Sequence, residues 1–149
     1  MKKFKFRYES VLKMRTDQED RIKNELAQVI AARQAKIDAL GSVDQSAKLY
    51  DAHVQSVLEF GDVSNERAGF SQNKRYYRDK KQELKDEIEK LDHKIKQIQV
   101  KLVEAMKDRK VMEKLKENAF KAFVEAINEA DEKLIEEVVN YSNNKRNGE

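Results

Sequence analysis

The chain has 149 residues, 40% of them charged, with four Gly and no Pro, Cys or Trp. The absence of cysteine excludes a disulfide framework, and a net charge of +3 from 31 basic and 28 acidic side chains excludes the strongly basic surface of a typical nucleic-acid-binding protein. Abundant helix formers predict long helices or a coiled coil, and the periodic apolar residues argue against disorder.

The first residues, Lys2 to Arg7, mix basic and aromatic side chains. Read alone they suit a short strand, an amphipathic membrane contact or the start of a helix. Phe4, Tyr8 and Val11 are spaced by four and three, which favours a helix that begins near residue 3. No apolar run of signal-peptide length follows, and no stretch is apolar enough to span a membrane, so we expect a cytosolic protein.

A first helical arm is predicted over about residues 3–60. Arg15, Gln18 and Arg33 occupy core-type positions in its apolar seam. Such polar residues can set register or face another partner, and an imperfect seam explains them equally well. Gly41 can bend the helix but is not predicted to be the main turn. His53 is expected at the edge of the interface.

The main turn is predicted at about residues 61–71, which concentrate Gly, Asp, Ser and Asn. A second arm then covers about 72–141, followed by a frayed tail, 142–149. We expect one all-α domain, 1–149, folded as a long two-helix antiparallel coiled-coil hairpin and shaped as an elongated rod.

The second arm carries the clearest heptad seam, with steps of four and three. Arg109 is its only charged member between Leu84 and Met112. Continuing the seam from Met112 to Leu115 adds a second step of three, which predicts local overwinding. The regular part of the seam is Leu84, Ile88, Leu91, Ile95, Ile98, Leu102, Ala105, Arg109 and Met112.

Charge favours the antiparallel direction. The basic N-terminal residues would then lie near an acidic stretch in the last third of the second arm, and opposite charges along a coiled coil select orientation. The acidic residues are Glu125, Glu129, Asp131, Glu132, Glu136 and Glu137.

Nothing in the chain predicts catalysis, a cofactor or a metal site. A two-helix rod has no enclosed interior, and the sequence has neither a thiol nor a phosphate-binding glycine loop. His93 follows Glu89 by four residues, but two ligands are too few for a metal, so we interpret His93 as a solvated surface residue.

A basic cluster with two tyrosines follows the predicted turn. Aromatic rings among Lys and Arg can bind a protein partner, extend the seam through Tyr77, or stack on bases, and we rank these readings in that order. The cluster comprises Lys74, Arg75, Tyr76, Tyr77, Arg78, Lys80 and Lys81.

Two segments resemble the FliJ proteins of the bacterial flagellar type III export apparatus. The opening is similar to that family's aromatic-x-aromatic start and Leu-x-x-Arg continuation, and a later segment is similar to its Lys-x-x-Glu-Lys-Leu segment and following aromatics. In this chain they read Phe4-Lys5-Phe6-Arg7 with Val11-Leu12-Lys13-Met14-Arg15, and Arg109-Lys110-Val111-Met112-Glu113-Lys114-Leu115-Lys116-Glu117 with Phe120 and Phe123.

The resemblance implies a non-enzymatic stalk, similar to the central coiled coil of rotary ATPases, at the cytoplasmic face of the inner-membrane export apparatus. It implies that the stalk binds the hexameric export ATPase and the cytoplasmic domain of the export gate and promotes export. The ATPase-binding candidates are Phe4, Phe6, Arg7, Arg109, Lys110, Glu113 and Lys114. The gate-binding candidates are Tyr50, Phe60, Phe70, Tyr76 and Tyr77.

Two alternatives stay open. The first is a general coiled-coil adaptor or chaperone for export substrates, with export chaperones as further partners. The second is a nucleic-acid or membrane-surface protein, which the balanced charge disfavours. We therefore expect no nucleic-acid partner and only indirect membrane contact.

Overall fold

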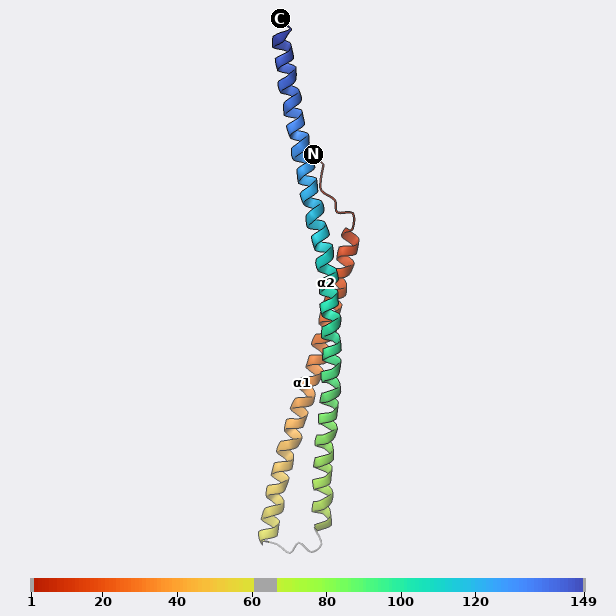
Figure 1. Cartoon of the computed structure of the whole chain (residues 1–149). Helices are drawn as coiled ribbons and strands as arrows, with labels where there is room; N and C mark the ends of the chain where they lie inside the picture. The colour runs from red at the N-terminus through yellow and green to blue at the C-terminus, as the bar shows by residue number, and fades with distance from the viewer. Residues whose placement is uncertain (1, 61–66, 149) are drawn as a thin grey trace. The chain divides into compact units, whose positions relative to one another are not determined.

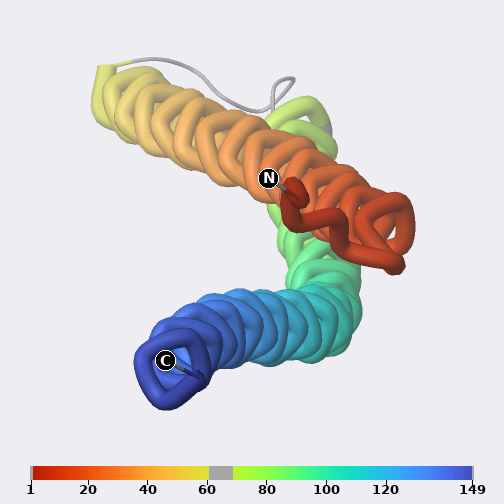
Figure 2. The backbone as a smooth tube through the Cα atoms, turned by 90° about the horizontal axis from the view of Figure 1, so that it is seen from above, coloured from red at the N-terminus to blue at the C-terminus, as the bar shows by residue number. Residues whose placement is uncertain are grey.

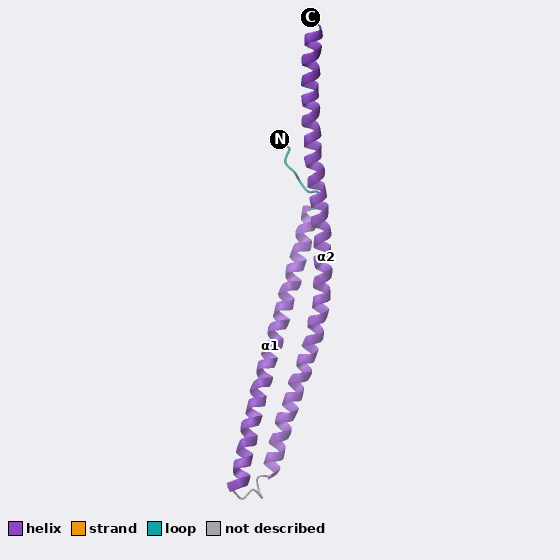
Figure 3. Cartoon of the chain, turned by 60° about the vertical axis from the view of Figure 1, so that its left-hand side comes forward, coloured by secondary structure: helices purple, strands orange, loops and turns teal. Residues whose placement is uncertain are grey.

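A computed structural model describes residues 2–60 and 67–148. These residues form two helices, α1 (Glu9–Phe60) and α2 (Arg67–Asn147), and no strand (Figures 1 and 3). The predicted all-α class is confirmed. No helix among the described residues has a stretch apolar and long enough to cross a membrane.

The chain divides into two compact units, and both helices contribute to each. Unit 1 comprises Met1–Asp20 and Glu104–Glu149, and unit 2 comprises Arg21–Val103. That the chain is a single domain stays a prediction.

Within unit 2, α1 and α2 are antiparallel, as ion pairs between them show. Arg33 pairs with Asp92, and Lys36 Nζ lies 2.8 Å from Glu87 Oε2. Further along α1, Asp44 Oδ1 lies 2.9 Å from Lys81 Nζ. As the residue number rises along α1, the residue number of its partner on α2 falls, which confirms the predicted antiparallel pairing.

The core of unit 2 is a narrow seam between the two helices. Ile98 is its most buried member, with 2% of its surface exposed. A seam this narrow explains why the apolar residues recur in steps of three and four instead of covering a broad helix face. The buried apolar residues of the unit are Val29, Ala47, Val54, Leu84 and Ile98.

Unit 1 begins with a segment, residues 2–8, that is not helical (Figure 2). The first arm therefore starts at Glu9 rather than near residue 3. The Glu9 N–H donates to the Phe6 carbonyl at 3.2 Å, and the Leu12 N–H donates to the Tyr8 carbonyl at 3.0 Å. A carboxylate in the first turn also suits the positive end of the helix dipole.

The ends of α2 also differ from the prediction. The helix starts at Arg67, inside the predicted turn, while residues 61–66 lie outside the described residues. It continues to Asn147, through most of the tail predicted to fray. Lys145 and Arg146 lie in its last turn, where basic side chains offset the helix dipole.

Two predicted seam positions are wrong. Gln18 is exposed, and the neighbouring Glu19 is buried instead. Leu115 is 45% exposed, and the seam passes through Lys116, which pairs with Glu9 at 2.9 Å. The steps of four and three therefore continue beyond Met112 without the expected second step of three.

Two further expectations concern single residues in α1. His53 is exposed instead of packed at the edge of the interface. Gly41 lies inside one uninterrupted helix, so it does not end α1.

Candidate interaction surfaces

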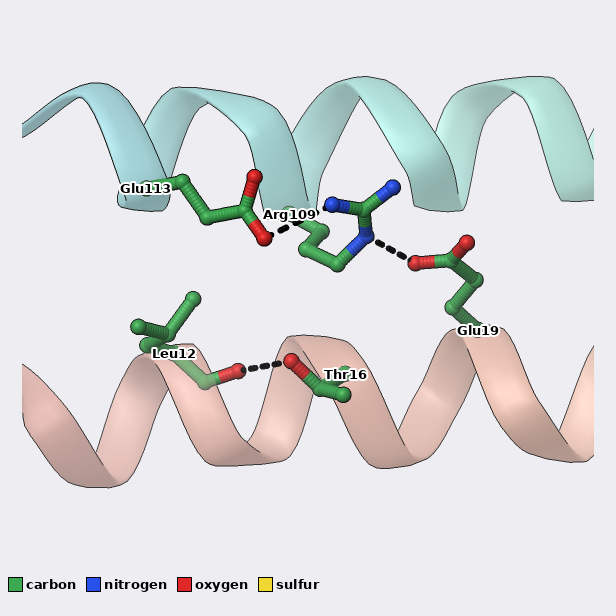
Figure 4. A network of polar contacts seen from close by, with 5 residues as sticks. All are labelled: Leu12, Thr16, Glu19, Arg109 and Glu113. Atoms are coloured by element: carbon green, nitrogen blue, oxygen red, sulfur yellow. Dashed lines mark hydrogen bonds and ion pairs between the residues drawn. The ribbon is translucent and has the colours of Figure 1, made fainter.

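A charged network occupies the seam of unit 1 (Figure 4). Arg109 Nε donates to Glu19 Oε2, and Arg109 Nη1 donates to Glu113 Oε1 at 2.7 Å. Glu19 is 2% exposed, so its carboxylate is removed from water and needs a cation beside it. The hydrogen bonds to Glu19 and then to Glu113 raise the pKa of Arg109, which holds the guanidinium charged.

This network divides the predicted ATPase-binding residues of α2 into two groups. Arg109 and Glu113 contact one another within the unit, so part of their bonding capacity is used internally. Lys110 and Lys114 are exposed, and Lys114 has only a loose contact with Glu117 at 3.6 Å. The two lysines are therefore the members best placed to meet a partner.

The N-terminal segment, residues 2–8, brings the other predicted ATPase-binding residues to the same unit. The Phe4 ring lies 5.3 Å from Phe120 and 5.5 Å from Phe123, measured between ring centroids. Phe6 lies 5.9 Å from the Tyr8 ring, and the Arg7 guanidinium stacks 5.5 Å from the same ring. The two ring contacts of Phe4 stabilise the segment against α2.

Beyond Phe123, α2 carries large apolar side chains that no part of the described chain covers. Every described residue from 124 to 148 is exposed. We name this surface the C-terminal apolar run. It comprises Ile127, Leu134, Ile135, Val138, Val139 and Tyr141.

The acidic side chains of this stretch do not meet the basic N-terminus as predicted. Glu125 to Glu137 are exposed, and no ion pair joins them to the described basic residues at 2–7. The segment stops short because Phe4 is packed against Phe120 and Phe123, at the beginning of the acidic stretch.

Four of the five predicted gate-binding residues form one aromatic cluster in unit 2. Tyr50 lies 6.4 Å from Phe70 and 5.7 Å from Tyr77, and Tyr76 lies 5.5 Å from Tyr77. Asn73 also donates a hydrogen bond to the Tyr50 hydroxyl at 3.0 Å. Tyr76 is 61% exposed, so the cluster presents one ring to solvent.

The fifth, Phe60, is 87% exposed at the last residue of α1. No ring contact joins it to the aromatic cluster among the described residues.

Beside the cluster lies a groove of about 580 Å³. Five cations line it and a single carboxylate, that of Asp51, lies among them. We name this surface the basic groove. Its cations are Lys74, Arg75, Arg78, Lys81 and Lys85, and Tyr77 lies between them.

His93 and Glu89, the pair considered for a metal site, lie on the surface of α2. His93 Nε2 lies 3.9 Å from Glu89 Oε1, and both side chains are exposed. No group of three potential ligands gathers among residues 2–60 and 67–148.

Sequence reasoning missed part of the unit 1 surface. The sequence identifies Phe120 and Phe123 as aromatic residues that follow the family-like segment. It does not predict that they contact Phe4. Their spacing of three places both on one helix face, which was the available signal. Glu19 had no such signal, because a glutamate next to a polar seam position is indistinguishable from a surface residue.

The protein comparisons identify the family. A family model described as "Flagellar FliJ protein" matches residues 4–148, nearly the whole chain, and confirms the resemblance found in the sequence. The searches of curated proteins and of solved structures returned no significant match. The chain therefore belongs to the FliJ family, a non-catalytic component of the flagellar export apparatus.

Proposed function

We propose that the protein binds the export ATPase through unit 1 and the export gate through unit 2, and that it promotes export without catalysing a reaction itself. It would do so in the cytoplasm, at the inner face of the export apparatus. Export chaperones are further candidate partners.

The C-terminal apolar run carries the proposal. Large apolar side chains left in water at successive turns of a helix are typical of a surface that a partner covers. The same unit holds all seven predicted ATPase-binding residues, so these residues and the apolar run can be contacted together. A ring-shaped ATPase enclosing this end would cover several faces of one helix.

The aromatic cluster supports the second contact. Tyrosine and phenylalanine are enriched at the energetic centres of protein interfaces, and exposed rings held by neighbouring rings lose little conformational freedom on binding. Tyr76 is the natural anchor because it is exposed yet rests on Tyr77.

Both contacts are tested by measuring ATPase stimulation and gate binding on the unmodified protein and on one variant for each contact. We expect the purified protein to raise ATP hydrolysis by its cognate export ATPase and to bind the gate's cytoplasmic domain. Lys110→Glu with Lys114→Glu should reduce the ATPase effect several-fold and leave gate binding intact, whereas Tyr76→Ala should do the reverse.

The matched control is Lys90→Glu with Lys94→Glu, which makes the same charge change at the same spacing on exposed residues of unit 2. Circular dichroism would confirm that every variant keeps its helix content. Absence of both binding and stimulation by the unmodified protein would contradict the ATPase contact.

The C-terminal apolar run also favours the adaptor alternative, since an amphipathic partner helix could cover it. Binding of export chaperones or substrates without any response of the ATPase would select this alternative.

A further inference from the structure

The distribution of charge within unit 2 singles out the basic groove. Between the paired parts of α1 and α2, two cations have a carboxylate partner on the opposite helix: Arg33 pairs with Asp92, and Lys36 pairs with Glu87. The hydrogen bond between Lys36 and Glu87 lowers the pKa of this glutamate, which keeps the pair ionised.

Of the five cations of the groove, one has such a partner among the described residues. Lys81 is the last cation with a carboxylate partner across the helices, Asp44, at 2.9 Å. Lys74, Arg75 and Lys85 form no ion pair within the described parts of the chain. Closely spaced cations without internal partners repel one another, so an anionic ligand would relieve an existing electrostatic cost.

The spacing of four of these cations matches the geometry of a helical ligand. Lys74, Arg78, Lys81 and Lys85 follow one another by steps of four, three and four, so they form one stripe along α2. The stripe flanks the seam that contains Leu84 and extends for about 16 Å at ~1.5 Å per residue. A third helix lying in the groove could place carboxylates at the same intervals.

The groove also offers apolar contact. Tyr77 lies between the cations and belongs to the aromatic cluster, which would pack against apolar residues of the same ligand. Nucleic acid is less well matched, because its phosphates would use the cations without requiring a heptad interval.

We propose that the basic groove binds an acidic helical segment of a partner protein, with carboxylates spaced to meet Lys74, Arg78, Lys81 and Lys85 and an apolar residue against Tyr77. This inference rests on the proposed function, because Tyr77 belongs to both the groove and the surface assigned to the gate.

The test uses a synthetic helical peptide of about 15 residues, close to the length at which isolated helices become stable. Its glutamates follow steps of four, three and four, with a leucine on the same side. A second peptide has the same composition, but its glutamates are spread around the helix. Fluorescence anisotropy on the full-length protein should show binding of the first peptide at least about tenfold tighter than that of the second.

Charge reversal locates the site. Lys74→Glu with Arg78→Glu should weaken binding of the first peptide roughly tenfold or more, and a peptide with lysines in place of only the two glutamates that face these positions should recover binding to this variant. The control Lys90→Glu with Lys94→Glu, of equal charge and spacing, should retain the affinity of the unmodified protein.

Several results would overturn the inference: equal binding of the two peptides, an affinity unchanged by the groove variant, or tighter binding of a single-stranded oligonucleotide or anionic vesicles at equal salt. Gate binding and ATPase stimulation are measured separately on the same variants. If the first peptide does not bind while gate binding and ATPase stimulation are intact, the groove assignment is wrong and the proposed function still stands.

Discussion

The contact between Arg109 and Glu19 is the most unusual residue-level feature of the protein. A charged pair in a narrow seam contributes little net stability, since the cost of removing both charges from water offsets their attraction. It does favour one register, because sliding either helix by a turn would leave Glu19 buried without Arg109. The pair therefore determines how the two helices are aligned more than it adds to the stability of the fold.

Substitution separates these effects. Glu19→Ala leaves a partly buried guanidinium with Glu113 as its remaining carboxylate contact, and we expect the melting temperature to fall by roughly 3–8 °C. Replacing both residues, Glu19→Leu with Arg109→Leu, should recover most of that loss, because two leucines pack in the seam without a desolvation cost. Thermal melts followed by circular dichroism measure both changes.

Glu104→Ala is the matched control, since it removes a glutamate from an exposed pair with Lys107 in the same unit and should change the melting temperature very little. A double variant as unstable as Glu19→Ala alone would contradict the idea that desolvation limits the pair.

The sequence predicted Arg109 as a seam residue but not its partner. The heptad count in α1 assigns the position to Gln18, by a step of three from Arg15, whereas the buried residue is Glu19, a step of four from Arg15. The same count predicts a helix from about residue 3. The N-terminal segment instead remains non-helical, so that Phe4 can reach Phe120 and Phe123. Such a long-range contact leaves no local pattern.

At the scale of the elements, α1 tolerates a glycine in its middle. Gly41 is exposed, and a Cβ added there would meet no atom within 4 Å. The glycine therefore contributes backbone freedom to the unfolded chain without providing a packing advantage in the helix.

We expect Gly41→Ala to increase the free energy of unfolding by about 0.5–1 kcal/mol. Chemical denaturation monitored by circular dichroism measures this change in the free energy of unfolding. Gly69→Ala is a suitable comparison, because Gly69 also has open space around it but lies in the first turn of α2, where the gain should be smaller. A loss of stability in Gly41→Ala would show that the helix needs a local distortion at this position.

The heptad pattern was sufficient to predict α2 from Leu84 to Met112, where Leu84, Ile98 and Ala105 are buried as expected. It was less informative where the seam residue is itself charged. Lys116 takes the position expected for Leu115 because its long aliphatic stem can lie along the seam while its ammonium group meets Glu9.

At the scale of the whole molecule, ion pairs at several points link stability to pH. The hydrogen bond from Lys81, followed by that from Lys48, lowers the pKa of Asp44, and Lys36 lowers that of Glu87. Lys121 lowers the pKa of Glu117 in the same way. Their ionised forms therefore favour the folded state.

The direction of the pH dependence follows from these shifts. Carboxylates with a lowered pKa stabilise fully above their ordinary values of 3.8 for Asp and 4.5 for Glu, and the stabilisation is lost as the pH falls through the lowered pKa. We therefore expect the melting temperature to decrease on acidification below about pH 4.5.

Thermal melts over a pH series, at low and high salt, measure this effect, which salt should weaken because the pairs are exposed. Lys36→Gln removes the main cause of the shift at Glu87 and should reduce the acid-induced loss. A melting temperature that rises on acidification would contradict the assigned sign.

The family was predictable from short motifs at residues 4–15 and 109–123, and its match over residues 4–148 confirmed it. The contacts within the candidate surfaces were not predictable to the same degree. Tyr50 lies at least 20 residues from Phe70, Tyr76 and Tyr77 in the sequence, yet the four form one cluster because the two helices bring them together.

The narrow seam has a consequence for how this protein can change during evolution. Only six apolar side chains are buried among the described residues, so most positions can be substituted with little effect on folding. Selection on the remaining positions then reflects what the surface must recognise. Two proteins of this design can thus share their spacing of apolar residues and few of their identities, and whatever identities they do share on the outer faces would mark common partners.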